Sequence, residues 1–133
     1  MQLSIDTEVV ALLRAKMQPG DVIYLDFEDG DGPFANTGLS CRLDLNFRLI
    51  ITPINYLASG LDVYNETLVT AIGPLKIKKS SERYLEENTR LTVNKALQTL
   101  QLKGDSGILA NNIPILRIDK VIAGGSDGKI SGC

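Results

Sequence analysis

The chain has 133 residues, 44% hydrophobic and 23% charged, which is the ordinary composition of a single globular domain. Its net charge of −2 and its few aromatic residues give no basic surface for nucleic acid and no platform for stacking bases. The absence of His excludes Ser-His-Asp and Cys-His catalysis, and two cysteines are too few for a disulfide scaffold. The sequence has no leader-like start and no apolar run that could cross a membrane, so we expect a cytoplasmic protein that binds neither nucleic acid nor membrane.

The first 33 residues predict a strand, a helix and a second strand. Residues 2–5 alternate polar and apolar side chains, as in a short strand. A helix is expected next, because Asp6 or Thr7 can cap its first turn with a side-chain oxygen, and Pro19-Gly20 stops it. Residues 22–27 are rich in β-branched and aromatic residues and predict a strand, and 28–33 have the composition of a loop.

The clearest pattern is the alternation of apolar and polar side chains over residues 39–49. It predicts a long strand with one buried face and one wet face, which Pro53 ends or bends. Cys41 lies on the apolar face of this strand. We therefore expect Cys41 to be buried and to act as a small apolar side chain. Apolar surroundings would keep it in its thiol form.

The rest of the chain predicts further short strands and little helix. Leu75 and Ile77 alternate with Lys76 and Lys78, which predicts a strand with its lysines outward. One or two helical turns over 80–87, capped by Ser80, are expected after it. Other strand-like segments are 61–72, 91–93, 99–102 and 113–118. The segments 91–93 and 99–102 are expected to be joined through a bulge near 94–95.

The whole pattern favours a mainly β fold, a small β-sandwich or rolled mixed sheet with an N-terminal helix. The domain is expected to span residues 1–120. Residues 121–133 are expected to form a flexible, Gly-rich C-terminal tail.

An acidic stretch between residues 26 and 31 is one candidate for chemistry. Its carboxylates are interleaved with glycines and could hold Ca²⁺ or Mg²⁺, but the EF-hand pattern is incomplete because Thr37 stands where the last ligand would be. The alternative is a solvated acidic turn. These same carboxylates would have to act as acid and base in an enzyme, and nothing in the sequence pairs two of them on a catalytic scaffold, so we expect no enzyme. The carboxylates of this acidic stretch are Asp26, Glu28, Asp29 and Asp31.

Cys133, the last residue, is the candidate metal ligand. It follows a glycine-rich stretch and could bind iron or an iron–sulfur cluster. Two cysteines cannot complete a tetrahedral thiolate site alone. They could do so only in a dimer or with an exogenous thiol such as glutathione.

The order of these features resembles the HesB-like, or A-type carrier, family of iron–sulfur cluster biosynthesis proteins, in particular its cysteine-poor members from Gram-positive bacteria. The resemblance covers roughly residues 1–118, and it implies the HesB-like domain fold and a role in cluster biosynthesis. The segments that carry it are 22–27, 38–45, 72–77 and 100–109.

The resemblance also gives positions for the family's cysteines. The cysteine of the family's central loop falls at Asn36, with Gly38 matching the second glycine of the motif, and an amide cannot replace a thiolate as an iron ligand. The Cys-Gly-Cys near the C-terminus is absent, and Gly132-Cys133 is at best its remnant.

Two functions therefore stay open. One is a divergent cluster biosynthesis protein of the A-type carrier kind, which binds iron or a cluster through Cys133 across a homodimer. The other is a non-catalytic module on the same fold that binds other proteins, such as components of iron–sulfur assembly, without metal.

Overall fold

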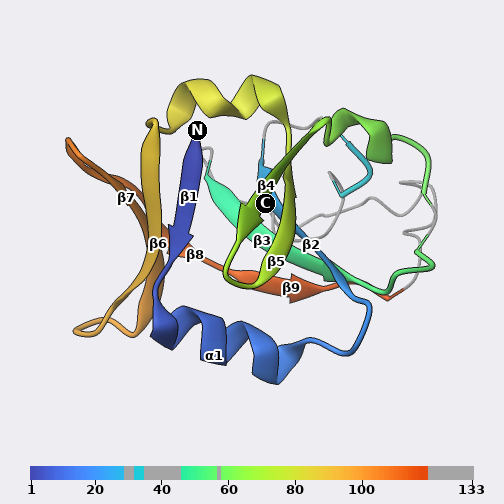
Figure 1. Ribbon diagram of the computed structural model, residues 1–133, viewed down its shortest axis with the longest axis horizontal. Helices are drawn as coiled ribbons and strands as arrows, with labels where there is room; N and C mark the ends of the chain where they lie inside the picture. The colour runs from blue at the N-terminus through green and yellow to red at the C-terminus, as the bar shows by residue number, and fades with distance from the viewer. Residues whose placement is uncertain (29–31, 35–45, 57, 120–133) are drawn as a thin grey trace, which may run out of the picture.

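The computed structural model describes residues 1–28, 32–34, 46–56 and 58–119, which form two mixed β-sheets and one α-helix (Figure 1). The four-stranded sheet has the order β1-β6-β7-β8, with β1 and β6 parallel. Its strands are β1 (Gln2–Ile5), β6 (Asn88–Asn94), β7 (Thr99–Gly104) and β8 (Gly107–Ile113).

The five-stranded sheet has the order β4-β5-β2-β3-β9, in which β2 and β5, and β3 and β9, are parallel. Its strands are β4 (Glu66–Thr70), β5 (Gly73–Ile77), β2 (Val22–Phe27), β3 (Phe47–Thr52) and β9 (Ile115–Arg117). The helices are α1 (Thr7–Lys16) and two short 3₁₀ helices, η1 (Leu61–Val63) and η2 (Lys79–Tyr84). The predicted mainly β fold with an N-terminal helix is confirmed.

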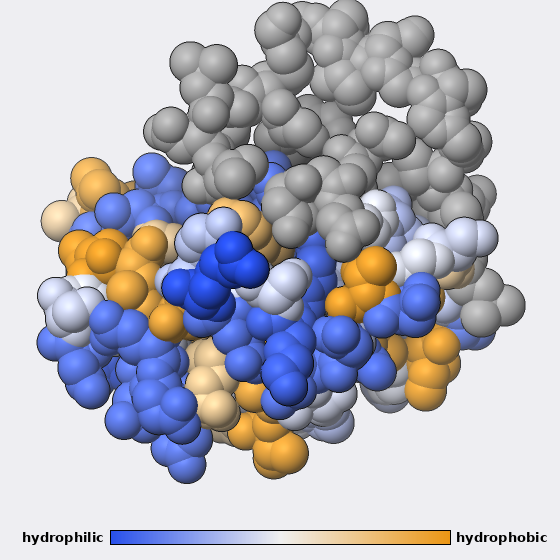
Figure 2. All heavy atoms as spheres, turned by 90° about the horizontal axis from the view of Figure 1, so that it is seen from above, coloured by the Kyte–Doolittle hydropathy of each residue, from blue (hydrophilic) through white to orange (hydrophobic). Residues whose placement is uncertain are grey.

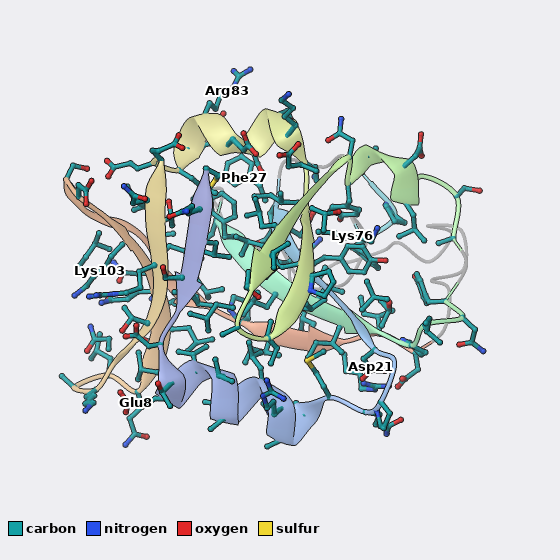
Figure 3. The ribbon with its side chains drawn as sticks, in the orientation of Figure 1. Glu8, Asp21, Phe27, Lys76, Arg83 and Lys103 are labelled. Carbon is teal, nitrogen blue, oxygen red and sulfur yellow. The ribbon has the colours of Figure 1, made fainter. Side chains whose placement is uncertain are left out.

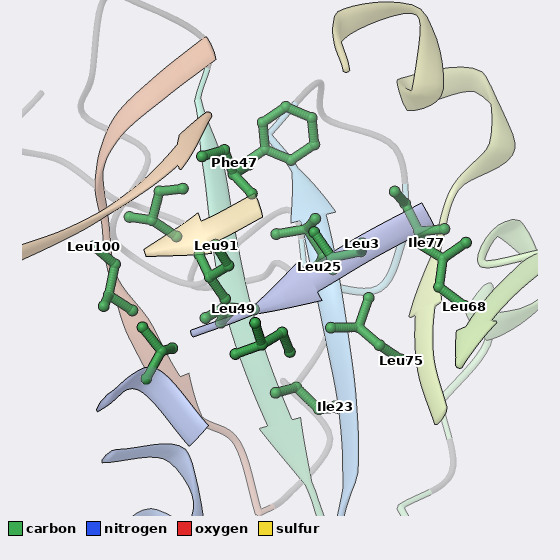
Figure 4. Packing of buried hydrophobic residues seen from close by; sticks show 14 of the residues in the cluster. Leu3, Ile23, Leu25, Phe47, Leu49, Leu68, Leu75, Ile77, Leu91 and Leu100 are labelled. Atoms are coloured by element: carbon green, nitrogen blue, oxygen red, sulfur yellow. The ribbon is translucent and has the colours of Figure 1, made fainter. Parts of the chain in front are cut away.

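The main core lies between the two sheets and is closed at one end by α1 (Figures 1 and 4). Because side chains alternate along a strand, every second residue of β2 and β3 points into this core. Val9 and Leu13 of α1 are fully buried there, four residues apart on one helix face. The strands contribute Leu3, Leu25, Leu49, Leu75, Leu91 and Leu102 among others.

The opposite face of the five-stranded sheet is also buried, which corrects the expected wet face of the long strand. All six residues of β3 are buried, because Phe34 and the segment before β4 cover this side of the sheet. The covering cluster is apolar and aromatic: Tyr24, Phe34, Ile50, Tyr56 and Tyr64. Of the predicted strand over 39–49, only its last part is described, as the start of β3.

Several local predictions differ from the structure in detail. Asp6 stands at the N-cap of α1 but makes no capping bond with its side chain; its carboxylate instead accepts a hydrogen bond from the Thr92 hydroxyl at 2.6 Å. Ser80 does not cap η2, which begins one residue earlier, at Lys79. β6 and β7 form an antiparallel hairpin and are not joined through a bulge; the register shifts lie between β7 and β8.

The strand β8 was not predicted. It leads directly into β9, so the chain passes from the four-stranded sheet to the five-stranded one within a few residues. Asn112 has a left-handed φ of 51° at this point, which asparagine tolerates better than most residues and which redirects the chain. Among the described residues, no helix is long and apolar enough to cross a membrane.

Candidate functional site

The candidate site lies at the base of the connection between β2 and β3, on the second buried face of the five-stranded sheet. The two strands are antiparallel neighbours, and their register places Asp26 opposite Arg48. The Glu28 N–H donates to the Asn46 carbonyl at 2.9 Å and closes the base of the connection. Two charged residues of neighbouring strands thus lie side by side beneath the connection, and both are almost wholly buried.

A buried charge cluster forms around the carboxylate of Asp26. Arg48 donates from Nε to Asp26 Oδ2 at 2.8 Å, and the Tyr64 hydroxyl donates to Asp26 Oδ1 at 2.7 Å. The Lys78 ammonium lies 3.3 Å from Asp26 Oδ1. Glu28 adds a second carboxylate, 3.8 Å from Arg48 Nη1. We call Asp26, Glu28, Arg48, Tyr64 and Lys78 the buried charge cluster.

The cations of the cluster are held by backbone carbonyls as well as by carboxylates. Arg48 Nη2 donates to the carbonyl of Phe34 at 2.6 Å, and Lys78 Nζ donates to that of Phe27 at 3.1 Å. The Lys78 ammonium also lies 5.8 Å from the centre of the Tyr64 ring. Arg48 therefore ties residues 32–34 to the sheet, and Lys78 ties the start of η2 to the end of β2.

Burial dictates the protonation state of Tyr64. Removal from water is the main cause that raises the pKa of its phenol, and the neighbouring Asp26 carboxylate raises it further. The phenol is consequently a hydrogen-bond donor to Asp26 at any physiological pH. Two cations and one phenol converge on a carboxylate that is 1% exposed, so Asp26 is not open to a substrate or a metal ion.

These contacts correct two predictions about charged residues. Asp26 belongs to β2 and is buried, so it is not part of a solvated acidic turn or of a Ca²⁺ loop. Lys78 does not point outward after β5, since it is 1% exposed. Asp29 and Asp31 lie outside the described residues. Within the described part of the chain, no three His, Cys, Asp or Glu side chains are placed to hold a metal ion.

The sequence-predicted cysteine sites lie outside the described residues as well. Cys41 and Cys133 are in this group, and so are Asn36 and Gly38. The burial of Cys41 and the role of Cys133 in metal binding therefore stay predictions. By sequence, Asn36 falls within the connection whose base the buried charge cluster holds.

Aromatic side chains border the same connection on the core side of the sheet. The Phe27 ring stacks on that of Tyr84 with 4.4 Å between centroids and meets that of Phe47 at 5.0 Å. With Asn46 they line a hollow of about 260 Å³ that also reaches β8. Figure 3 labels Phe27 beneath η2, and Figure 2, seen from the η2 side, shows apolar side chains there as separate patches among polar ones.

A second ion pair fixes the end of β9. The Arg117 guanidinium donates to the Asp21 carboxylate, and the hydrogen bond from Arg117 is the main cause that lowers the pKa of Asp21 from its ordinary value of 3.8. A carboxyl whose pKa is lowered on folding stabilises the protein above its unfolded pKa, and that contribution is lost as the pH falls through the lowered value. Asp21 Oδ2 also accepts the Gln18 N–H at 2.7 Å.

We expect Asp21→Asn to make the free energy of unfolding depend less on pH in the acid range. The variant should be less stable than the wild type near pH 7, and the difference should shrink as the pH falls below about 3.8, since protonated Asp21 also lacks the ion pair. Urea denaturation from pH 2 to pH 7 measures this. Asp62→Asn, at an exposed position of η1, is the matched control and should leave the profile unchanged. A constant difference between Asp21→Asn and wild type at every pH would contradict the assignment.

The fold is thus that of a two-sheet, mainly β domain whose β2–β3 connection stands on a buried charge cluster. The chain belongs to the iron–sulphur cluster biosynthesis family, whose model matches residues 1–117. A comparison with curated proteins finds no match.

Two solved structures from lactobacilli are similar. One is a proposed Fe–S biosynthesis protein from Lactobacillus salivarius, described as having a novel fold; it is 25% identical, with a TM-score of 0.75, over 90% of this chain and 99% of that one. The other, a proposed Fe–S biosynthesis protein from Lactobacillus acidophilus, is 16% identical with a TM-score of 0.62, over 88% of this chain and 90% of that one, and supports the fold alone. The predicted family is confirmed.

Arg48, Tyr64 and Lys78 were missed as site residues. Arg48 was assigned to a wet face, Lys78 to an outward position, and Tyr64 was not singled out. One signal was available in the sequence: Asp26 and Arg48 each interrupt a run of apolar strand residues. A charge inside such a run is buried unless the strand is at the surface, and a buried charge needs a partner.

Proposed function

We propose that the chain serves iron–sulfur cluster biosynthesis in the cytoplasm as a non-enzymatic module that binds other proteins and does not itself hold a cluster. One observation carries the proposal: the whole chain has two cysteines and no histidine. Iron–sulfur clusters are held by four ligands, which are mostly cysteine thiolates and sometimes histidine. A single chain is therefore two such ligands short, even if Cys41 and Cys133 both contributed.

The buried charge cluster supports the non-enzymatic part of the proposal. Asp26, the first carboxylate that an enzyme here would need, is surrounded by Arg48, Tyr64 and Lys78 and has almost no exposed surface. A general acid or base must reach the substrate within hydrogen-bond distance. The geometry of Asp26 favours a supporting role, in which the cluster holds the β2–β3 connection in place.

Anaerobic reconstitution tests this function. The wild type and Cys133→Ser are incubated with ferrous iron and sulfide, with and without glutathione, and excess reagent is removed. We expect neither protein to keep the visible absorption of a cluster, or iron and sulfide in equal amounts. The carrier alternative predicts a coloured wild-type dimer that Cys133→Ser abolishes, and that result would contradict the proposal.

A further inference from the structure

A groove of about 690 Å³ lies between α1 and the strands β7, β8 and β9. Leu12 of α1 forms one wall and is 38% exposed, while Leu100, Ile113 and Ile115 form the apolar floor. Figure 1 shows α1 and β9 running beside each other on this side of the molecule. The buried charge cluster does not line this groove, so it is a separate feature of the fold.

Ile115, the first residue of the edge strand β9, lines this groove. β9 is the last strand in the order of its sheet and pairs with β3 alone among the described strands. On the β3 side, the Pro114 carbonyl accepts the Leu49 N–H and the Ile118 N–H donates to the Ile51 carbonyl, each at 2.9 Å. Backbone groups alternate sides along a strand, so the N–H and C=O groups of Ile115 and Arg117 point to the other edge, away from β3.

An open strand edge beside an apolar groove fits one kind of ligand particularly well. An extended peptide can pair its main chain with such an edge and place alternate side chains in the adjoining hollows. A helical ligand would satisfy its main-chain groups within itself, except at its two ends, and would leave the edge unpaired. β9 has only three residues, so the pairing would centre on Ile115 and Arg117, whose main-chain groups point away from β3.

The rim of the groove is basic on balance. Lys16 and Lys95 both line it, and both are exposed. Lys95 faces Glu8 with 3.6 Å between Nζ and Oε2 (Glu8 is labelled in Figure 3), whereas Lys16 makes no ion pair with another described residue. This charge balance favours a ligand that carries acidic side chains beside its apolar ones.

We infer that the groove binds an extended, apolar and acidic segment of a partner protein, which joins the five-stranded sheet as a new strand beside β9. This inference rests on the proposed role as a protein-binding module and specifies the partner segment. Main-chain pairing supplies general affinity, and the apolar floor and Lys16 supply the preference for side chains.

The test uses the full chain and a capped hexapeptide in which valine alternates with glutamate. In the free protein, we expect the amide protons of Ile115 and Arg117 to exchange quickly with solvent and that of Leu116 slowly. Added peptide should shift and protect the first two amides in NMR spectra. The same peptide N-methylated on its pairing edge should not bind, because it lacks the main-chain donors.

Two variants and two matched controls locate the site. Leu12→Glu should weaken peptide binding about tenfold, since it places a charge in the apolar wall. Lys16→Glu should weaken binding about threefold, as expected for one exposed charge contact. Val69→Glu, on the exposed face of β4, and Lys79→Glu, in η2, should leave the affinity unchanged. Far-ultraviolet circular dichroism shows whether all four variants fold.

Several results would overturn the inference. Equal binding of the N-methylated peptide would exclude strand addition, and shifts confined to residues outside the groove would place the peptide elsewhere. Protection of Ile115 and Arg117 in the free protein at every dilution would mean that the chain fills its own groove. Protection that appears only at high protein concentration would point to a second copy. None of these outcomes depends on whether the protein holds a cluster, so failure here is distinguishable from failure of the proposed function.

Discussion

Replacing Asp26 with Asn is expected to lower the free energy of unfolding by about 3–5 kcal/mol, the usual cost of leaving buried charges without their partner. The substitution keeps the shape of the side chain but removes the charge that Arg48 and Lys78 share. Both cations are almost fully buried, so water cannot replace the lost carboxylate. Urea denaturation at pH 7, with the wild type measured in parallel, gives the difference.

Two further variants separate charge from packing at this site. Asp62→Asn makes the same chemical change at an exposed position and should shift the unfolding free energy by no more than about 0.5 kcal/mol. Asp26→Asn combined with Lys78→Met should be more stable than Asp26→Asn alone, because the second change removes one unpaired buried cation. A loss below about 1 kcal/mol for Asp26→Asn would show that the cluster is hydrated and not sealed.

Replacing Leu91 with Ala should lower the free energy of unfolding by about 2–5 kcal/mol, as for other fully buried leucines. Leu91 lies in β6, pairs with Ile5 and Leu102 on its two sides, and has no exposed surface. Its side chain belongs to the core between the two sheets, where a void cannot close without moving both (Figure 4).

Leu97→Ala is the matched control for Leu91→Ala. Leu97 lies in the turn between β6 and β7 and is 67% exposed, so its truncation should change the unfolding free energy by no more than about 0.5 kcal/mol. Equal losses for both leucines would contradict the placement of the core between the sheets.

Alternation in the sequence predicted several of the strands, because a half-buried strand has a period that the side chains display. β1 and β5 were placed this way, β2 was placed by its β-branched and aromatic residues, and Pro53 was correctly expected to end β3. The pattern failed where both faces of a strand are buried. It also failed where pairing with another strand, and not the local sequence, makes a segment a strand. β8 was missed because Asn111 and Asn112 have low β propensity, and its pairing with β7 compensates for that.

The candidate site was harder to predict than the fold. Alternation assigned Arg48 to the solvent side of its strand, and it does lie opposite the apolar residues of the main core. What the sequence did not reveal is that Phe34, Tyr56 and Tyr64 cover this second face. That cover comes from segments far apart in the chain, and local periodicity carries no information about them. The Asp26–Arg48 pair depends on strand register, which a single sequence does not fix.

The buried charge cluster and the groove divide the molecule between a supporting and a binding function. Arg48 holds residues 32–34 on the sheet, and Lys78 holds the start of η2 against the end of β2. No residue of the buried charge cluster lines the groove between α1 and β9. Partner binding at β9 would therefore not require any change at the base of the β2–β3 connection.

The central claim is that one chain lacks the ligands to hold an iron–sulfur cluster. Native mass spectrometry of protein purified and kept under anaerobic conditions tests it most directly, because it weighs the intact chain with whatever it holds. The account predicts the mass of the polypeptide alone, as one copy or two, without added iron or sulfide. A monomer or a dimer that carries the mass of a complete cluster would contradict it.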